Sequence, residues 1–268
     1  MPLVRRALAS PWSFFAALAA FVAATLALDR HADAGGQLAL GLVTWLFLVL
    51  ACRDLEPVDR ARVAAIVLVA TVGEILGSIV LGLYTYRLHN LPSFVPPGHG
   101  LVYLAGLQVS RSPLVRRHAR AVVGAALAIG AGWALVGVTV AGRPDIAGAL
   151  CMAALGVFLL RARVPAIYAC MFACVALLEL YGTAVGTWRW AEVWPTFGLP
   201  SGNPPSGIAA GYCLFDAAAL ALGPRLLALW RAGGPVAAVR RLQRLRSAAA
   251  SPSEVEVGSA CAPQASSA

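Results

Sequence analysis

Apolar runs follow one another along almost the whole chain, separated by short polar segments. They occupy roughly residues 1–28, 38–52, 62–84, 99–110, 119–141, 145–160, 165–188 and 207–230. Most of them approach the roughly 20 residues that cross a bilayer as a helix. Their apolar and polar residues do not alternate as they do in the strands of a membrane barrel. The pattern therefore predicts an all-α, polytopic membrane protein with about eight transmembrane helices.

Two of these runs are less simple than the others. The first has basic residues before its apolar part, as a secretory signal peptide has, but further apolar runs follow at once. We interpret it as a retained first helix. The run at 99–110 is short for a span, and we expect it to tilt, to thin the bilayer locally or to be re-entrant.

Arginines gather at one set of run ends and are sparse at the other. The rich set holds Arg5, Arg6, Arg53, Arg60, Arg62, Arg111, Arg116, Arg117, Arg120, Arg161, Arg163, Arg225 and Arg231, and the sparse set holds Arg30, Arg87, Arg143 and Arg189. Cytoplasmic loops carry the excess of basic residues. Both termini are therefore predicted on the cytoplasmic side of an inner (plasma) membrane, provided that the short run at 99–110 also crosses.

Two stretches of the chain resemble each other and indicate an internal duplication. Residues 74–86 read EILGSIVLGLYTY, and residues 179–190 read ELYGTAVGTWRW. Each stretch continues through a polar loop and a Pro-Pro pair into another apolar run. We predict two parallel four-helix repeats, residues 1–117 and 118–232. A basic amphipathic segment and a disordered cytoplasmic tail are expected to follow at 233–268.

The composition narrows the classes of function. The chain is 60% hydrophobic and only 12% charged, with a mean hydropathy of +0.77, whereas soluble domains carry about 25% charged residues. We assign the net charge of +9 to cytoplasmic loops and not to nucleic-acid binding. The six cysteines form no disulfide framework, and no metal or nucleotide motif is present, so no metal and no cofactor is expected. The expected partners are the lipid bilayer and a lipid-soluble small molecule.

Acidic residues inside apolar runs are the candidates for catalysis. Glu74, Glu179 and Asp216 each lie about ten residues from the end of a run, which places them roughly 15 Å deep. Intramembrane carboxyl groups are energetically costly and by default mark functional sites. Such a group suits a proton donor, a proton relay or a hydrogen-bonding strut between helices. His99, at the start of a run, is a fourth candidate, either for proton exchange or as a helix cap.

Aromatic and polar residues near the same run ends are candidates for substrate binding. They are Tyr84, Tyr86, Arg87, Tyr103, Trp188, Arg189, Trp190 and Asn203. Taken singly, the aromatic residues suit an interfacial belt and the arginines suit interface anchors. Taken together, the aromatic residues are also suited to roof a cavity and to stabilise positive charge. The small-residue pairs beside the acids, such as Gly73 with Gly77 and Gly182 with Gly186, predict close helix packing.

The repeated pattern resembles integral-membrane carotenoid hydratases and is loosely similar to membrane lycopene cyclases. The residues that carry the resemblance are Glu74, Gly77, Ser78, Gly82, Tyr84 and Tyr86, with Glu179, Gly182, Thr183, Gly186, Trp188 and Trp190 in the second copy. The resemblance implies that a buried acid protonates a polyene double bond and that aromatic rings stabilise the resulting cation.

Three functions remain open at this point. The first is a membrane-embedded enzyme that acts on a lipid-soluble isoprenoid by acid–base chemistry. The second is a proton-coupled transporter, since parallel repeats with acids near the bilayer midplane also suit a carrier. The third is a scaffold in which the acids only hold helices together.

Overall fold

The computed structural model describes residues 10–231. Its helices are α2 (Pro11–Asp29), α3 (Ala34–Cys52), α4 (Pro57–Glu74), α5 (Val95–Ser110), α6 (Pro113–Arg117), α7 (Ala119–Thr139), α8 (Ile146–Arg161), α9 (Pro165–Val185) and α10 (Ala209–Arg231), with the π-helix η1 (Ile75–Val80) continuing α4. The strands are β1 (Tyr84–Tyr86), β2 (Trp188–Trp190), β3 (Val193–Trp194) and β4 (Leu199–Pro200). The chain divides into units of residues 1–226 and 227–268, and the contacts described below lie within the first unit.

Within residues 10–231, six helices are long and apolar enough to cross a membrane. They are α2, α3, α4 with η1, α7, α9 and α10. Large apolar side chains such as Leu42, Leu135 and Leu160 lie exposed on the helices of this unit, which suits a surface that faces lipid. The predicted class, a mostly helical multi-pass membrane protein, is confirmed. The count of eight spans, the two repeats, the boundary at residue 117 and the orientation stay predictions, and 233–268 lies outside the described residues.

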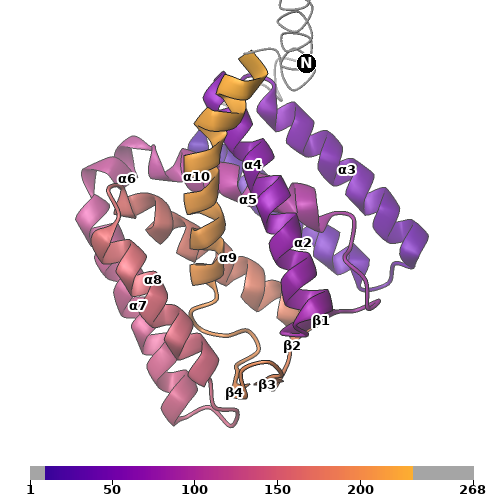
Figure 1. Cartoon of the computed structure of the whole chain (residues 1–268), viewed down its shortest axis with the longest axis vertical. Coiled ribbons are helices and arrows are strands. Elements are labelled where there is room, and N and C mark those ends of the chain that lie inside the picture. Colours follow the sequence, from indigo (N-terminus) through magenta and orange to yellow (C-terminus); the bar gives the residue numbers. More distant parts are fainter. Residues whose placement is uncertain (1–9, 232–268) are drawn as a thin grey trace, which may run out of the picture. The chain divides into compact units, whose positions relative to one another are not determined.

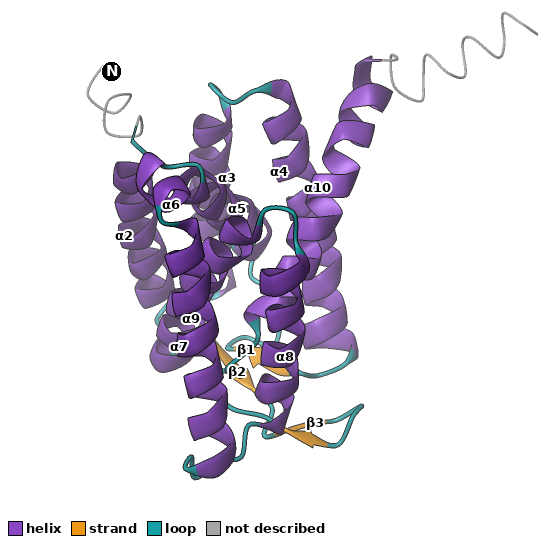
Figure 2. Ribbon diagram, turned by 90° about the vertical axis from the view of Figure 1, so that its left-hand side faces the viewer, coloured by secondary structure: helices purple, strands orange, loops and turns teal. Residues whose placement is uncertain are grey.

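The short run at 99–110 forms the central helix of the unit. Helix α5 contacts α2, α3, α4 and α9, and Figures 1 and 2 show it among the other helices. Most of its side chains are buried, from Pro97 to Ser110. A helix that neighbouring helices enclose need not match the length of a span, because it packs against protein and not against lipid. Enclosure therefore explains the short run.

The helix that leads into each copy of the repeated motif ends earlier than the apolar pattern predicted. The runs at 62–84 and 165–188 were expected to be helical throughout, but the helices stop at Val80 and Val185. Gly82 and Gly186 follow with φ of 62° and 81°, a left-handed conformation that glycine adopts without steric cost. The chain then turns into strands β1 and β2, which lie toward one end of the helices in Figure 2.

Strands β1 and β2 pair with each other although about a hundred residues separate them. The pairing is antiparallel and sets Tyr84 opposite Trp190 and Tyr86 opposite Trp188. All four rings are buried, with at most 9% of any residue exposed. The prediction of an interfacial aromatic belt is therefore wrong for these residues. The paired strands instead hold the four rings against Glu74, at the end of α4, and Glu179 on α9.

The π-helix η1 compensates for a difference in length between the two copies of the motif. Ten residues separate Glu74 from Tyr84, but only nine separate Glu179 from Trp188. In η1 the Leu81 N–H donates to the Leu76 carbonyl, five residues earlier, which is how a π-helix accommodates one extra residue. Both glutamates consequently reach the aromatic pair of the strand that follows.

Asp145 fixes the loop that leads into α10. Its carboxylate accepts hydrogen bonds from the main-chain N–H groups of Gly148 at 3.0 Å, Gly202 at 2.7 Å and Ser206 at 2.7 Å. Gly148 lies in the first turn of α8, so Asp145 caps that helix and also ties it to the loop. This bonding positions the loop residue Asn203, whose side-chain oxygen accepts the main-chain N–H of Trp190 at 2.9 Å.

Candidate functional site

The two glutamates of the duplicated motif line one cavity. Its volume is about 200 Å³, and its wall comes from α2, α3, α4, η1, β1, α5, α9, β2 and α10. Most of the wall is apolar, with Phe21, Leu26 and Leu101 among the lining residues. Glu74 and Glu179 are only 6% and 3% exposed. The cavity is thus an apolar chamber with two carboxyl groups in its wall.

Both glutamates lie nearer the helix ends than the sequence suggested. The helices end six residues beyond each of them, at Val80 and Val185. At 1.5 Å per residue, that distance is about 9 Å and not the expected 15 Å. The strand residues that follow cover the ends of these helices, so the carboxyl groups are nevertheless buried.

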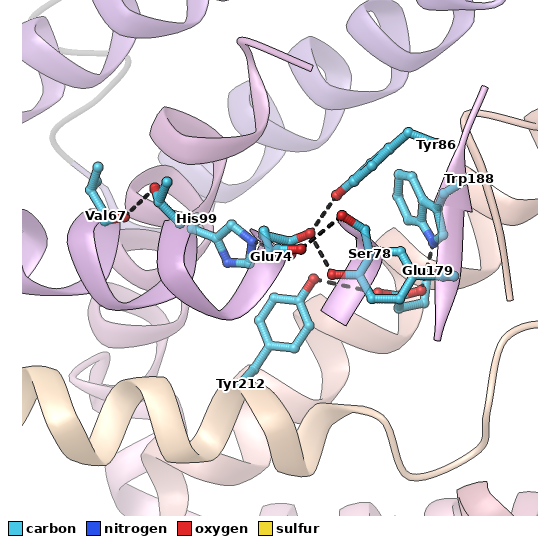
Figure 3. A network of polar contacts seen from close by, with 10 residues as sticks. Val67, Glu74, Ser78, Tyr86, His99, Glu179, Trp188 and Tyr212 are labelled. Atoms are coloured by element: carbon cyan, nitrogen blue, oxygen red, sulfur yellow. Dashed lines mark hydrogen bonds and ion pairs between the residues drawn. The ribbon is translucent and has the colours of Figure 1, made fainter. Parts of the chain in front are cut away.

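Glu74 has three partners that come from two elements. Its Oε2 accepts hydrogen bonds from the hydroxyls of Tyr84 at 2.5 Å and Tyr86 at 2.7 Å. Its Oε1 lies 2.8 Å from Nε2 of His99 on α5, and Figure 3 shows these groups pointing toward one another. Burial first, and then the charge of Glu74, raise the pKa of the Tyr84 and Tyr86 phenols above their usual range. The two phenols therefore stay protonated and act as donors.

Glu179 has a parallel set of partners with different chemistry. Its Oε2 accepts the indole N–H groups of Trp188 at 2.8 Å and Trp190 at 3.0 Å. Its Oε1 lies 3.4 Å from the hydroxyl of Tyr212 on α10. Each glutamate thus bonds the two aromatic residues of its own strand through Oε2 and faces the next long helix through Oε1.

The donor types distinguish the two carboxyl groups. An indole N–H can only donate, whereas a phenol or an imidazole can donate or accept. Oε2 of Glu179 must therefore be an acceptor, and any proton on this carboxyl must reside on Oε1. At Glu74 the two phenols likewise donate to Oε2, but the imidazole at Oε1 can accept a proton as well as donate one. The two sites thus have the same geometry but different capacities to exchange protons.

His99 and Tyr212 connect the two carboxyl groups. Their rings stack with centroids 5.1 Å apart and planes inclined by 26°. Because His99 contacts Glu74 and Tyr212 contacts Glu179, a continuous set of polar side chains joins the two acids (Figure 3). Tyr212 was not among the predicted site residues, although it lies in the apolar run that follows the second stretch and its Pro-Pro pair, and that position is the signal that could have identified it.

Two glycines of the motif, Gly77 and Gly182, allow an aromatic ring, and not a neighbouring helix, to approach the backbone closely. A side chain at Gly77 would meet the ring of Tyr84, and one at Gly182 would meet the ring of Trp188. The prediction of helix–helix packing is wrong for these two positions. The neighbouring hydroxyls, on Ser78 and Thr183, donate at 2.7 Å to the main-chain carbonyls of Glu74 and Glu179. They do not bond the carboxyl groups.

Several predicted binding residues lie outside the cavity wall. Arg87 donates to the Ala32 carbonyl and lies 3.7 Å from Asp29, so it ties β1 to the segment between α2 and α3. Arg189 is exposed and lies 3.6 Å from Glu192. Asn203 supports the backbone of β2, as described above. None of the three lines the cavity.

Asp216 and Tyr103 are buried in the helical core and do not line the cavity. Asp216 was a candidate for catalysis and Tyr103 a candidate for substrate binding, but the two are 1% and 0% exposed and are absent from the cavity wall. Within residues 10–231, neither Oδ2 of Asp216 nor the Tyr103 hydroxyl has a hydrogen-bond partner. Asp216 lies about one helical turn after Tyr212 on α10. The tyrosine lines the cavity, and the aspartate does not.

No group of three or more His, Cys, Asp or Glu side chains within residues 10–231 is arranged to hold a metal ion. Comparison of the chain with protein-family models, with curated proteins and with solved structures finds no match.

Proposed function

We propose that the chain is a membrane-embedded enzyme that adds water across a carbon–carbon double bond of a lipid-soluble isoprenoid. The observation that supports this proposal is the pair of buried glutamates in one apolar cavity, each with a different donor set. An apolar chamber suits an alkene, and two carboxyl groups with separate proton environments suit an acid and a base.

In this proposal Glu179 is the acid. Its proton resides on Oε1, because the two indole N–H groups occupy Oε2. Transfer of that proton to one alkene carbon forms a C–H bond and leaves a cation on the neighbouring carbon. The rings of Tyr84, Tyr86, Trp188 and Trp190 present electron-rich faces that stabilise such a cation.

Glu74 and His99 act together as the base. A water molecule adds to the cation through its oxygen, and Glu74 accepts the proton that the oxygen releases. The net reaction is the addition of one water to the double bond. Return of that proton from Glu74 to Glu179 restores both carboxyl groups for the next turnover.

The test is production of a hydrated product in a bacterial strain that makes an acyclic carotenoid. Extracts from cells with the wild-type chain are expected to contain a pigment heavier by one water. Glu179→Gln keeps the shape of the side chain but cannot donate the proton, and it should lower product formation by about 10²-fold or more. Glu192→Gln, at an exposed residue, is the matched control and should match the wild type.

The alternatives give different results in the same strain. A scaffold would yield no hydrated pigment with any variant. A carrier would yield unchanged pigments but a proton flux that depends on Glu74 and Glu179. Either result would refute the enzyme proposal.

A further inference from the structure

A second hollow adjoins the cavity, between α2, α5 and α9. It has a volume of about 280 Å³. Its lining residues are Phe15, Leu18, Ala19, Val22, Ala23, Val102, Ala105, Cys174, Leu177, Leu178 and Tyr181. No charged side chain is among them. We call this hollow the lateral groove.

The lateral groove shares part of its wall with the cavity that holds the glutamates. Val22, Val102 and Leu178 line both hollows. Along α2 the combined lining runs from Phe15 to Leu26, which is about 16 Å at 1.5 Å per residue. The two hollows therefore lie next to each other along α2, and the carboxyl groups line only the first of them.

The rim of the groove lies on the outer surface of the helices. Leu177 and Tyr181 line it and are 60% and 37% exposed. Both belong to α9, a helix long enough to cross the membrane, so the rim faces lipid. The Tyr181 hydroxyl donates to the Ala23 carbonyl of α2 at 3.1 Å. This bond satisfies the one hydroxyl of the lining.

We infer that the lateral groove binds the linear hydrocarbon chain of the substrate, which enters from the bilayer between α2 and α9. The inference rests on the proposed function, because the reactive double bond must reach Glu74 and Glu179. Alanines at positions 19, 23 and 105 line the groove, and such small side chains leave space for a narrow chain. The apolar lining stabilises the chain by the hydrophobic effect, while the lack of charge disfavours a polar head group.

A matched pair of substitutions tests the groove. Ala19 and Ala20 are neighbouring exposed residues of α2, but only Ala19 lines the groove. Ala19→Trp should lower hydration of an acyclic carotenoid by about tenfold or more, since the indole occupies the space of the chain. Ala20→Trp should leave hydration unchanged, and equal rates in the two variants would overturn the inference.

A second measurement detects binding of a hydrocarbon chain in the groove independently of catalysis. Cys174 lines the groove, whereas Cys52 is also partly buried but lines neither hollow. Protein in lipid nanodiscs is treated with N-ethylmaleimide, with and without squalene as a linear hydrocarbon probe, and the adducts are counted by mass spectrometry. Squalene should slow the reaction of Cys174 by about fivefold or more, because a bound probe leaves few open sites. The reaction of Cys52 should not change.

The two proposals fail in distinguishable ways. Glu179→Gln should retain full protection of Cys174 by squalene, because the substitution removes the acid and not the groove. Protection without any hydration would refute the enzyme and leave the groove as a hydrocarbon site. Hydration without protection, and with full activity of Ala19→Trp, would refute the groove and leave the enzyme.

Discussion

At the scale of single residues, the chemistry of the donors separates Glu74 from Glu179. Two phenols and an imidazole surround the first carboxyl group, and two indoles and one more distant phenol surround the second. Since an indole fixes the direction of its hydrogen bond, the tryptophans of β2 determine which oxygen of Glu179 can carry a proton.

This role of the indoles predicts unequal effects of two similar substitutions. Trp190 donates to Glu179, whereas Nε1 of Trp194 is buried without a partner within residues 10–231. Trp190→Phe and Trp194→Phe both shrink a buried ring. Only Trp190→Phe removes a hydrogen bond, so it should lower the free energy of unfolding by about 1–2 kcal/mol more than Trp194→Phe does. Chemical unfolding in detergent micelles measures the difference, and equal losses would contradict the assigned hydrogen bond.

Sequence reasoning predicted several residues that the structure brings together in one cavity wall, because a pattern that occurs twice marks residues that a single motif would not. Glu74, Glu179, His99 and the four aromatic residues of β1 and β2 were all predicted as site residues and all line the cavity. Asp216 carried the same signal, an acid within an apolar run, but lies outside the wall. The position of a side chain around its helix decides that outcome, and an apolar run without amphipathic periodicity does not reveal it.

At the scale of elements, the short strands are what the apolar pattern missed. Each of β1 and β2 has three residues and directly follows a long apolar helix. Three residues are too few for a period of two to be distinguished from a helix. Moreover, each strand finds its partner far away in the sequence, so local propensity alone does not predict the pairing.

The π-helix gives a prediction that belongs to this scale. Deletion of Ile79, an exposed residue of η1, should let the segment close as an α-helix and preserve the contacts between Glu74 and β1. Deletion of Ala184, an exposed residue of α9, should instead turn β2 away from Glu179, since α9 has no extra residue to lose. The deletion of Ile79 should therefore retain a higher midpoint of thermal unfolding and more hydration activity. The opposite order would show that η1 is not the compensating element.

At the scale of the whole molecule, the apolar pattern predicted which segments are helical but not where each helix lies in the folded unit. A helix forms in each of the eight apolar runs, because long apolar segments satisfy their backbone hydrogen bonds as helices. Two of these helices, α5 and α8, have only 16 residues each. The enclosure of α5 by four other helices is a property of the folded unit, and hydropathy along the chain does not contain it.

The number of arginines at the ends of the apolar runs is also a less direct indicator of membrane orientation than the sequence alone suggested. Arg62 and Arg111 were both counted as basic residues of the rich set, yet both bond Asp59, at 2.8 Å and 2.6 Å. The charge of Asp59 raises the pKa of Arg111 through this hydrogen bond. Arg111 therefore links the end of α5 to the start of α4, while Arg62 bonds Asp59 within α4, in addition to any effect on orientation.

The most direct test of the central claim is isotopic labelling of the product by purified protein in nanodiscs. With an acyclic carotenoid in water enriched in oxygen-18 and deuterium, the wild type should place one heavy oxygen and one deuterium on neighbouring carbons. Glu74→Gln and Glu179→Gln should each lower the rate by about 10²–10⁴-fold, while Glu192→Gln retains it. Product without both labels, or full rates in both cavity variants, would contradict acid–base hydration by this pair of glutamates.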